Sequence, residues 1–273
     1  MRDNSPRTRS MMASDIQPTE ASADVFVIVA AYNEADRIAE TLAALAQAFP
    51  GAQVWVADDG STDGTAALAE AAGATVVRSE RMIGKGGAVT LAARELLREI
   101  GRPAPAHGSE APADGGAAPT RARAGDSPDG EPVVVLCDGD LERSAALLGG
   151  LVQSVRDGQA DLAVAAFARR VGGGVGLAIG FARWAIRRRC GLELRAPISG
   201  QRALRAGLLA QVLPLAPGFG MEIGMTIDAA RAGVRVGEID LDLSHRATGR
   251  TLGGFLHRGR QLIDFVRVYW TRR

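Results

Sequence analysis

The chain alternates between unbroken apolar runs and segments whose apolar residues recur at helical spacing. The apolar runs predict buried strands at residues 25–31, 53–57, 74–77, 133–136 and 161–166. After the first run, Ile38, Leu42 and Leu45 predict a helix that ends near Phe49-Pro50. Unbroken apolar strands are typical of a parallel sheet that is covered on both faces. The order strand, helix, strand, helix therefore predicts an α/β fold with a doubly wound, mostly parallel sheet.

Glycines and small polar residues mark the ends of the predicted helices. We expect Ser61 or Thr62 to cap an alanine-rich helix that closes at Gly73. A glycine-rich turn at residues 83–88 predicts the start of a helix that continues through Leu97. The remaining predicted elements are helices at residues 145–155, around the arginines of 183–189 and from 218 to 232, and a strand at 234–243.

Three further segments flank or interrupt this pattern. Residues 1–24 are polar without a period, and residues 101–132 are rich in Pro, Gly and Ala, so both are expected to be disordered. Residues 252–273 predict an amphipathic helix whose arginines lie off its apolar face, and such a helix more often covers a core than binds a membrane. The sequence thus predicts one domain over residues 25–273, with 101–132 as an insertion.

Composition narrows the class of protein. The formal net charge is +1, so the overall charge predicts no nucleic-acid partner. Cys137 and Cys190 lack metal-finger spacing and are expected to be buried free thiols in a reducing cytosol. No apolar run approaches the ~20 residues that cross a bilayer, and the polar start lacks the core of a signal peptide. We expect a cytoplasmic protein; peripheral contact with the inner face of the cell membrane is the alternative.

Polar side chains follow three of the predicted strands, where ligands of open α/β sheets bind. They are Asn33, Glu34, Asp58, Asp59, Asp138 and Asp140. Asp138 and Asp140 are two residues apart, so on an extended chain they point the same way and could share one cation. With His245, these carboxylates suit Mg²⁺ or Mn²⁺ rather than a structural zinc. Such an ion would neutralise a diphosphate leaving group.

The glycine-flanked Lys85 adds a positive charge to this predicted nucleotide site. Glycines on both sides would let the backbone approach a ligand closely. The turn lacks the spacing of a phosphate-binding loop, and the first strand is not followed by the dinucleotide pattern Gly-x-Gly-x-x-Gly. The sequence therefore argues against ATPases and dehydrogenases.

Four motifs resemble those of family 2 glycosyltransferases with a GT-A fold. They are Ala31-Tyr32-Asn33-Glu34, Asp58-Asp59-Gly60-Ser61-Thr62-Asp63-Gly64-Thr65, Gly84-Lys85-Gly86 and Asp138-Gly139-Asp140. The second string is highly specific, whereas Asp-x-Asp alone is not. Ala31 stands where the family usually has proline, and alanine keeps the same extended backbone. Ser199–Ala203, Gly220–Gly224 and His245-Arg246 are similar to the branch that contains glucosyl-3-phosphoglycerate synthases and polyprenyl-phosphate glycosyltransferases.

This resemblance implies a GT-A, Rossmann-like fold with a C-terminal acceptor-side region, and roles for particular residues. The residues implied to bind the nucleotide sugar are Ala30, Ala31, Tyr32, Asn33, Glu34, Asp58, Asp59, Lys85, Asp138, Gly139 and Arg246. Asp140 and His245 would ligate the metal, and the acceptor-side loop would contain Gly172, Gly173, Gly174 and Val175. Asp138 would contact ribose or sugar. Glu222 would deprotonate the acceptor in an inverting reaction, or position groups on the sugar in a retaining one.

The most favoured function is a metal-dependent transfer of a sugar from a nucleoside diphosphate, with UDP favoured by the resemblance alone. The acceptor would be a phosphorylated small molecule or a polyprenyl phosphate, and a homodimer is compatible with the sequence. A sugar-phosphate nucleotidyltransferase and a non-catalytic nucleotide-binding module are the alternatives. Each acid also has a structural alternative: turn former or helix cap for Asp58, Asp59 and Asp63, and helix N-terminal carboxylate for Glu222.

Overall fold

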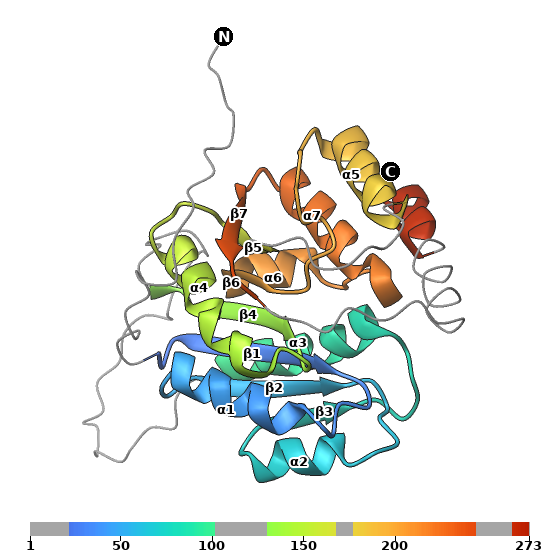
Figure 1. The fold of residues 1–273 in the computed structure, drawn as a ribbon. Helices are drawn as coiled ribbons and strands as arrows, with labels where there is room; N and C mark the ends of the chain where they lie inside the picture. The colour runs from blue at the N-terminus through green and yellow to red at the C-terminus, as the bar shows by residue number, and fades with distance from the viewer. Residues whose placement is uncertain (1–21, 102–129, 168–176, 244–263, 273) are drawn as a thin grey trace, which may run out of the picture.

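The computed structural model describes residues 22–101, 130–167, 177–243 and 264–272. Its centre is a seven-stranded sheet in the order β3-β2-β1-β4-β6-β5-β7, flanked by helices (Figure 1). The strands are β1 Val25–Ala31, β2 Gln53–Asp58, β3 Thr75–Arg78, β4 Val133–Asp138, β5 Leu162–Phe167, β6 Arg202–Arg205 and β7 Val236–Leu241. The predicted α/β fold with a mostly parallel sheet is confirmed.

The helices follow the strands in the predicted alternation. The α-helices are α1 Ile38–Ala48, α2 Thr65–Ala71, α3 Lys85–Ile100, α4 Gly149–Arg156, α5 Leu177–Cys190, α6 Ala206–Val212 and α7 Met221–Arg231. Two 3₁₀ helices, η3 Glu142–Leu148 and η4 Gly218–Gly220, precede α4 and α7, and residues 264–271 are also helical. The helix predicted at residues 145–155 therefore begins earlier, as η3.

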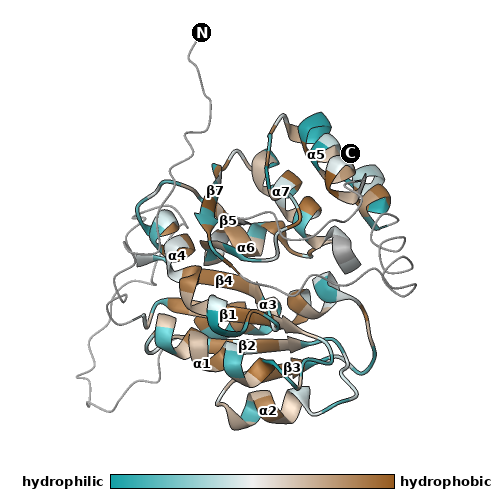
Figure 2. Ribbon diagram, viewed as in Figure 1, coloured by the Kyte–Doolittle hydropathy of each residue, from teal (hydrophilic) through white to brown (hydrophobic). Residues whose placement is uncertain are grey.

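Successive residues of β1 point to opposite faces of the sheet and enter two separate cores. Val27 and Val29 pack in one core with residues of α1, η3 and α4, whereas Ile28 packs in the other with residues of α3, α6 and α7. Figure 2 shows β1, β2 and β4 as apolar strands between these layers. This two-sided burial is why their sequences read as unbroken apolar runs.

Strand β6 is the one reversal in the sheet, and it was not predicted. It runs antiparallel to both β4 and β5, while the other pairs are parallel. Only four residues long, it begins and ends with arginine, so it lacks the apolar run that identifies the other strands. Arg202 is nonetheless fully buried, because its guanidinium donates to the carbonyl oxygens of Ser199 and Pro197 and to the Thr226 hydroxyl.

The predicted cap of α2 is wrong. The helix begins at Thr65, and neither Ser61 nor Thr62 caps it. Asp63 instead accepts a hydrogen bond from the Thr65 backbone N–H at 3.0 Å. The Ser61 hydroxyl is used elsewhere, since it accepts from the Asn33 backbone N–H and donates to Asp58.

The described part of the C-terminal segment packs against the body of the protein. Phe265 and Val268 are buried in a third apolar cluster with residues of α5 and α7. Both cysteines are free thiols; burial raises the pKa of Cys137 and Cys190. No helix in the described ranges has the length and apolarity needed to cross a bilayer. The segments predicted to be disordered lie almost entirely outside the described residues.

Candidate active site

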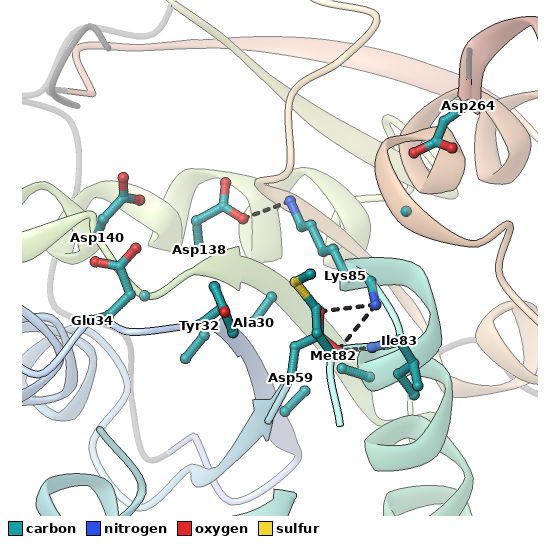
Figure 3. A pocket seen from close by; sticks show the side chains of 16 residues that line it. Ala30, Tyr32, Glu34, Asp59, Met82, Ile83, Lys85, Asp138, Asp140 and Asp264 are labelled. Carbon is teal, nitrogen blue, oxygen red and sulfur yellow. Dashed lines mark hydrogen bonds and ion pairs between the residues drawn. The ribbon is translucent and has the colours of Figure 1, made fainter. Parts of the chain in front are cut away.

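A cavity of about 910 Å³ lies at the carboxyl ends of β1, β2 and β4. Its walls come from all three strand ends, the start of α3, η4 and the C-terminal helix (Figure 3). The lining residues are Ala30, Ala31, Tyr32, Glu34, Ala57, Asp59, Met82, Ile83, Gly84, Lys85, Ala88, Asp138, Gly139, Asp140, Gly218 and Asp264. This volume lies in the range of small-molecule sites.

Asp138, at the end of β4, is held by two side chains from other elements. The Lys85 ammonium lies 2.5 Å from Asp138 Oδ1, and the Gln201 amide donates to Oδ2 at 2.8 Å. Gln201 is itself buried and accepts a hydrogen bond from the Ser199 hydroxyl. Both carboxylate oxygens therefore already have partners.

Gly139 lets the chain turn closely past β1. Its backbone N–H donates to the Ala30 carbonyl oxygen, and an added Cβ would lie only 3.3 Å from that oxygen. Beyond it, Asp140 lies next to Glu34 in Figure 3, with its side chain 30% exposed. Arg37 Nη1 lies 4.0 Å from Asp140 Oδ2. Asp140 thus presents its carboxylate at the cavity wall.

Lys85 joins two carboxylates at the N-terminus of α3. Its ammonium lies 2.8 Å from Glu222 Oε1 as well as close to Asp138. Burial favours the neutral amine, but the two carboxylates outweigh burial and raise the pKa of Lys85, so it stays charged. The neighbouring Gly86 allows close packing within the chain, since a Cβ there would lie 1.8 Å from the Ala216 carbonyl oxygen.

Glu222 lies beneath Lys85 rather than on the cavity wall. Its side chain is 6% exposed, at the first turn of α7, where the helix dipole favours a carboxylate. It is absent from the cavity lining, and its contact toward the cavity is Lys85. The structure therefore connects Glu222 to Asp138 through one lysine.

Asp59 holds the turn that precedes α3. Its carboxylate accepts hydrogen bonds from the backbone N–H groups of Ile83, at 2.7 Å, and Gly84, at 2.9 Å. Burial raises the pKa of Asp59, and these two hydrogen bonds partly offset that effect. Met82, Ile83 and Gly84 are thereby fixed as one wall of the cavity.

Asp58 and Asn33 lie outside the cavity lining and organise the loops behind it. Asp58 is fully buried, accepts from the Ser61 backbone N–H at 3.0 Å and pairs with Arg78 Nε at 3.3 Å. Asn33 adopts a left-handed backbone with φ 54°, which asparagine tolerates. Its Oδ1 accepts from the Thr62 backbone N–H at 2.8 Å, so it ties the β1 loop to the β2 loop.

Tyr32 and Glu34 stand at the β1 side of the cavity. Tyr32 is 43% exposed. Glu34 pairs with Arg37 at 2.8 Å. Burial is the main cause that raises the pKa of Glu34 to about 7; Arg37 opposes the shift and Asp140 adds to it. Glu34 is therefore hard to ionise mainly because it is buried, and the negative charge of Asp140 adds to the effect.

The acids around β4 fit a divalent cation that is shared with a ligand. No group of three or more His, Cys, Asp or Glu side chains within the described ranges is arranged to hold a metal. Mg²⁺ is commonly held by one or two carboxylates together with substrate phosphates, which needs no such group. Asp138 and Asp140 both line the cavity, and the predicted metal ligand is Asp140. His245, the other predicted ligand, lies outside the described residues.

Six predicted site residues lie outside the residues that the structure describes. They are His245, Arg246, Gly172, Gly173, Gly174 and Val175. Conversely, Met82, Gly218 and Asp264 line the cavity and were not predicted. Met82 could have been predicted, because it is close in sequence to Lys85. Asp264 could not, because it reaches the cavity only through the packing of the C-terminal helix against α5 and α7.

Comparison with known families gives one match, which covers the segment from β1 to α3. Residues 26–99 match the family model described as "Glycosyl transferase family 2". The match runs from β1 to the end of α3 and includes Asp59 and Lys85. This part of the chain is therefore similar to family 2 glycosyltransferases. Among curated proteins, none matches the chain.

Solved structures of glucosyl-3-phosphoglycerate synthase from Mycobacterium tuberculosis share the fold. The complex with phosphoglyceric acid has a TM-score of 0.68 at 24% identity, over 98% of this chain and 88% of that chain. The complex with Mn²⁺, UDP and phosphoglyceric acid has a TM-score of 0.64 at 26% identity, over 91% and 78%. The complex with Mn²⁺, UDP-glucose and glycerol 3-phosphate has a TM-score of 0.61 at 25% identity, over 91% and 79%.

Proposed function

We propose that this protein moves a hexose from a UDP-sugar to an acceptor that carries a phosphate. The observation that carries the proposal is the Lys85 bridge between Asp138 and Glu222, on the wall of a cavity that also presents Asp140. Similar solved structures contain UDP or UDP-glucose with phosphoglyceric acid or glycerol 3-phosphate. These ligands support the choice of donor and acceptor class for this chain.

In this proposal, the nucleoside binds between the β1 end and the turn held by Asp59. Ala30, Ala31 and Tyr32 supply one side, and Met82 to Gly84 supply the other. The turn needs no rearrangement to receive the base, because the Asp59 carboxylate already fixes its backbone. Preorganisation of this kind lowers the entropic cost of binding.

The sugar diphosphate would then lie over Lys85, Asp138 and Asp140. The Lys85 ammonium supplies positive charge next to the diphosphate, and Asp138, fixed by Gln201, accepts a hydrogen bond from ribose or sugar hydroxyls. Asp140 and His245 would hold Mg²⁺ or Mn²⁺, which when bound would stabilise the charge that develops on the leaving diphosphate. Arg246 would add a further positive charge.

For Glu222, the contact with Lys85 supports a positioning role through that lysine. A base must lie within hydrogen-bond reach of the acceptor proton, and Glu222 is covered by Lys85. Glu222→Gln keeps an acceptor for the ammonium but removes the charge. A base would lose nearly all activity and its acid limb in the pH profile, whereas a positioning residue would lose about tenfold with the profile retained.

Two classes of acceptor are candidates, and both carry a phosphate. A phosphorylated three-carbon acid is supported by the ligands of the similar structures. A polyprenyl phosphate is favoured by the exposed aromatic residues of α5 and the C-terminal helix, among them Trp184 and Trp270. The loop proposed to face either acceptor contains residues 172–175.

Donor binding is tested by thermal shift with UDP-glucose, GDP-glucose and UDP, each with and without Mn²⁺. A ligand at 100 times its Kd stabilises the folded state by about 2.7 kcal/mol, so the true donor should raise the melting temperature by several degrees. Absence of any metal-dependent shift would contradict the proposal.

Transfer is tested with 3-phosphoglycerate, glycerol 3-phosphate and vesicle-borne polyprenyl phosphate as acceptors. Product formation should require one of them and Asp140. Release of diphosphate together with nucleotidyl transfer to a sugar phosphate would instead identify a nucleotidyltransferase. Binding of UDP-sugar with no turnover on any acceptor, unchanged by Asp140→Asn, would indicate a non-catalytic module.

A further inference from the structure

Four aromatic rings from two distant segments form a continuous cluster on α5 and the C-terminal helix. The ring centroids of Phe181 and Trp184 lie 5.5 Å apart, those of Trp184 and Tyr269 4.8 Å, and those of Tyr269 and Trp270 5.8 Å. We call these four residues the aromatic patch. In Figure 1 the two helices lie side by side, on the side of the molecule away from β3.

The aromatic patch is open to solvent although a core lies directly beneath it. Trp184 is 46% exposed and Trp270 is 56% exposed, while the third tryptophan of the chain, Trp55, is buried in the sheet. Val266, one helical turn before Trp270, is a further exposed apolar residue of the C-terminal helix. Underneath, residues such as Ile186, Phe265 and Val268 already fill the apolar cluster. The exposed rings are therefore surplus to the core, which marks an interaction surface.

The surroundings of the patch are strongly basic. Helix α5 contains four arginines and no acid, and the C-terminal helix, which begins at Asp264, contains Arg267 and is followed by Arg272. The nearby acids Glu193 and Asp228 are already paired with Arg187 and Arg272. The arginines are Arg183, Arg187, Arg188, Arg189, Arg267 and Arg272.

Arg188 and Arg267 contribute positive charge that no acid of the described ranges balances. Both are exposed, and neither side chain makes an ion pair or hydrogen bond with any residue of the described ranges. Arg188 lies one helical turn after Trp184, and Arg267 lies three residues before Trp270, so each charge adjoins an exposed ring. Arg189 stacks on the Tyr269 ring at 3.9 Å and fixes the patch between the two helices.

We propose that the aromatic patch and its arginines dock on the surface of an anionic lipid bilayer. Indole and phenol rings partition to the level of the lipid headgroups, and arginine side chains extend to the phosphates. Basic residues near an anionic leaflet each contribute to binding, and this surface contains both aromatic and basic residues. A second copy of this chain is a poorer partner, because a two-fold interface would place the same arginines against each other.

The position of the patch relates docking to the cavity. Asp264, which lines the cavity, begins the same helix that carries Tyr269 and Trp270. Five residues of helix rise about 7.5 Å, so a bound bilayer would lie close to the cavity mouth. Docking does not depend on the proposed sugar transfer, although it would deliver a lipid-borne acceptor to that mouth.

The test is sedimentation of the full-length protein with sucrose-loaded vesicles. Vesicles of phosphatidylcholine and phosphatidylglycerol in a 7:3 ratio are compared with phosphatidylcholine alone, at low and high NaCl. Binding is expected only to the anionic vesicles and should weaken as salt rises. Arg188→Gln and Arg267→Gln should each lower the partition coefficient about 5-fold. Trp270→Ser should lower it about tenfold or more.

Matched controls separate the patch from general surface effects. Arg94→Gln removes an exposed arginine from α3, and Leu68→Ser removes an exposed apolar side chain from α2; neither should change vesicle binding. Circular dichroism shows whether each variant is folded. The UDP-glucose thermal shift shows whether donor binding is retained when vesicle binding is lost. Absence of binding to anionic vesicles, or equal binding of patch and control variants, would overturn the proposal. Patch-dependent dimerisation without vesicle binding would overturn it in favour of a second copy.

Discussion

The two acidic strand ends of this chain look alike in sequence and are used differently. Asp58 and Asp59 end β2, and Asp138 and Asp140 end or follow β4. The acids after β2 accept hydrogen bonds from the backbone N–H groups of Ser61, Ile83 and Gly84. Asp138 is held by side chains, and Asp140 faces the cavity. The acids at the end of β2 thus hold loops through backbone N–H groups, whereas both acids at the end of β4 line the cavity.

The difference follows from where each carboxylate points. At the last position of β2, Asp58 is enclosed by the β1 and β3 loops and has no access to the cavity. Buried carboxylates need local partners: Asp58 Oδ1 accepts hydrogen bonds from Ser61, and Oδ2 forms an ion pair with Arg78 without accepting a hydrogen bond. On β4, Gly139 turns the chain across β1, so Asp140 emerges beside Glu34 at the cavity wall. One glycine thus separates Asp138, the candidate sugar-binding acid, from Asp140, the candidate ligand for a metal.

The largest expected effect on activity is from Asp140→Asn. The substitution keeps the size of the side chain but removes its charge, and we expect transfer to fall about 10³-fold, because charge stabilisation at a leaving group amounts to several kcal/mol. Initial rates at saturating UDP-sugar measure it. Asp36→Asn, which alters an exposed acid outside the cavity lining, is the matched control and should retain activity. Comparable losses of activity in both variants would contradict a specific role of Asp140 in the transfer.

Asp58→Ala should have the largest effect on stability. It removes a fully buried carboxylate that bonds to Ser61 and pairs with Arg78, and we expect the free energy of unfolding to fall by about 2–4 kcal/mol. Urea denaturation measures the change. Asp36→Ala should cost less than about 0.5 kcal/mol. A fall for Asp58→Ala no larger than that of the control would show that the β2 acids do not build the loop.

Asp59→Ala tests an acid that both holds a loop and lines the cavity. Without its carboxylate, the N–H groups of Ile83 and Gly84 lose their acceptor and the wall formed by Met82 to Gly84 loosens. We expect the Kd for the UDP-sugar to rise about tenfold, with the rate at saturation nearly unchanged. Asp59→Asn keeps one acceptor oxygen and should restore part of the affinity. A loss confined to the saturated rate would instead assign Asp59 to the chemistry.

The sequence predicted the sheet well because buried parallel strands have an unmistakable apolar pattern. It missed β6 because a strand bounded by Arg202 and Arg205 carries no such pattern, and its burial depends on acceptors at Ser199, Pro197 and Thr226. Those contacts exist only after the chain has folded.

The sequence predicted which strand ends carry the site, but it did not predict which carboxylates hold loops and which line the cavity. Motifs brought Asp58, Asp59, Asp138 and Asp140 to one edge of the sheet, whereas the direction of each carboxylate depends on backbone turns at Gly60 and Gly139. The link from Lys85 to Glu222 joins residues 137 positions apart, and no local pattern encodes it.

The smallest expected effect concerns Asp63, whose hydrogen bonds favour its charged form. The Thr65 hydroxyl donates to Asp63 and is the main cause that lowers the pKa of this carboxyl, with the Thr65 and Ala35 backbone N–H groups adding to the effect. A lowered folded-state pKa contributes stability above the ordinary value of about 3.9, and this contribution is lost as the pH falls through the folded-state pKa. Asp63→Asn should therefore lower the melting temperature by about 2 °C at pH 7, and the difference from the unsubstituted protein should shrink as the pH falls below the ordinary pKa of about 3.9. Thermal unfolding of both proteins at pH 7, 5 and 3, with Asp36→Asn as control, measures this. A difference that stays constant across the three pH values would show that the loss does not come from the charge of Asp63.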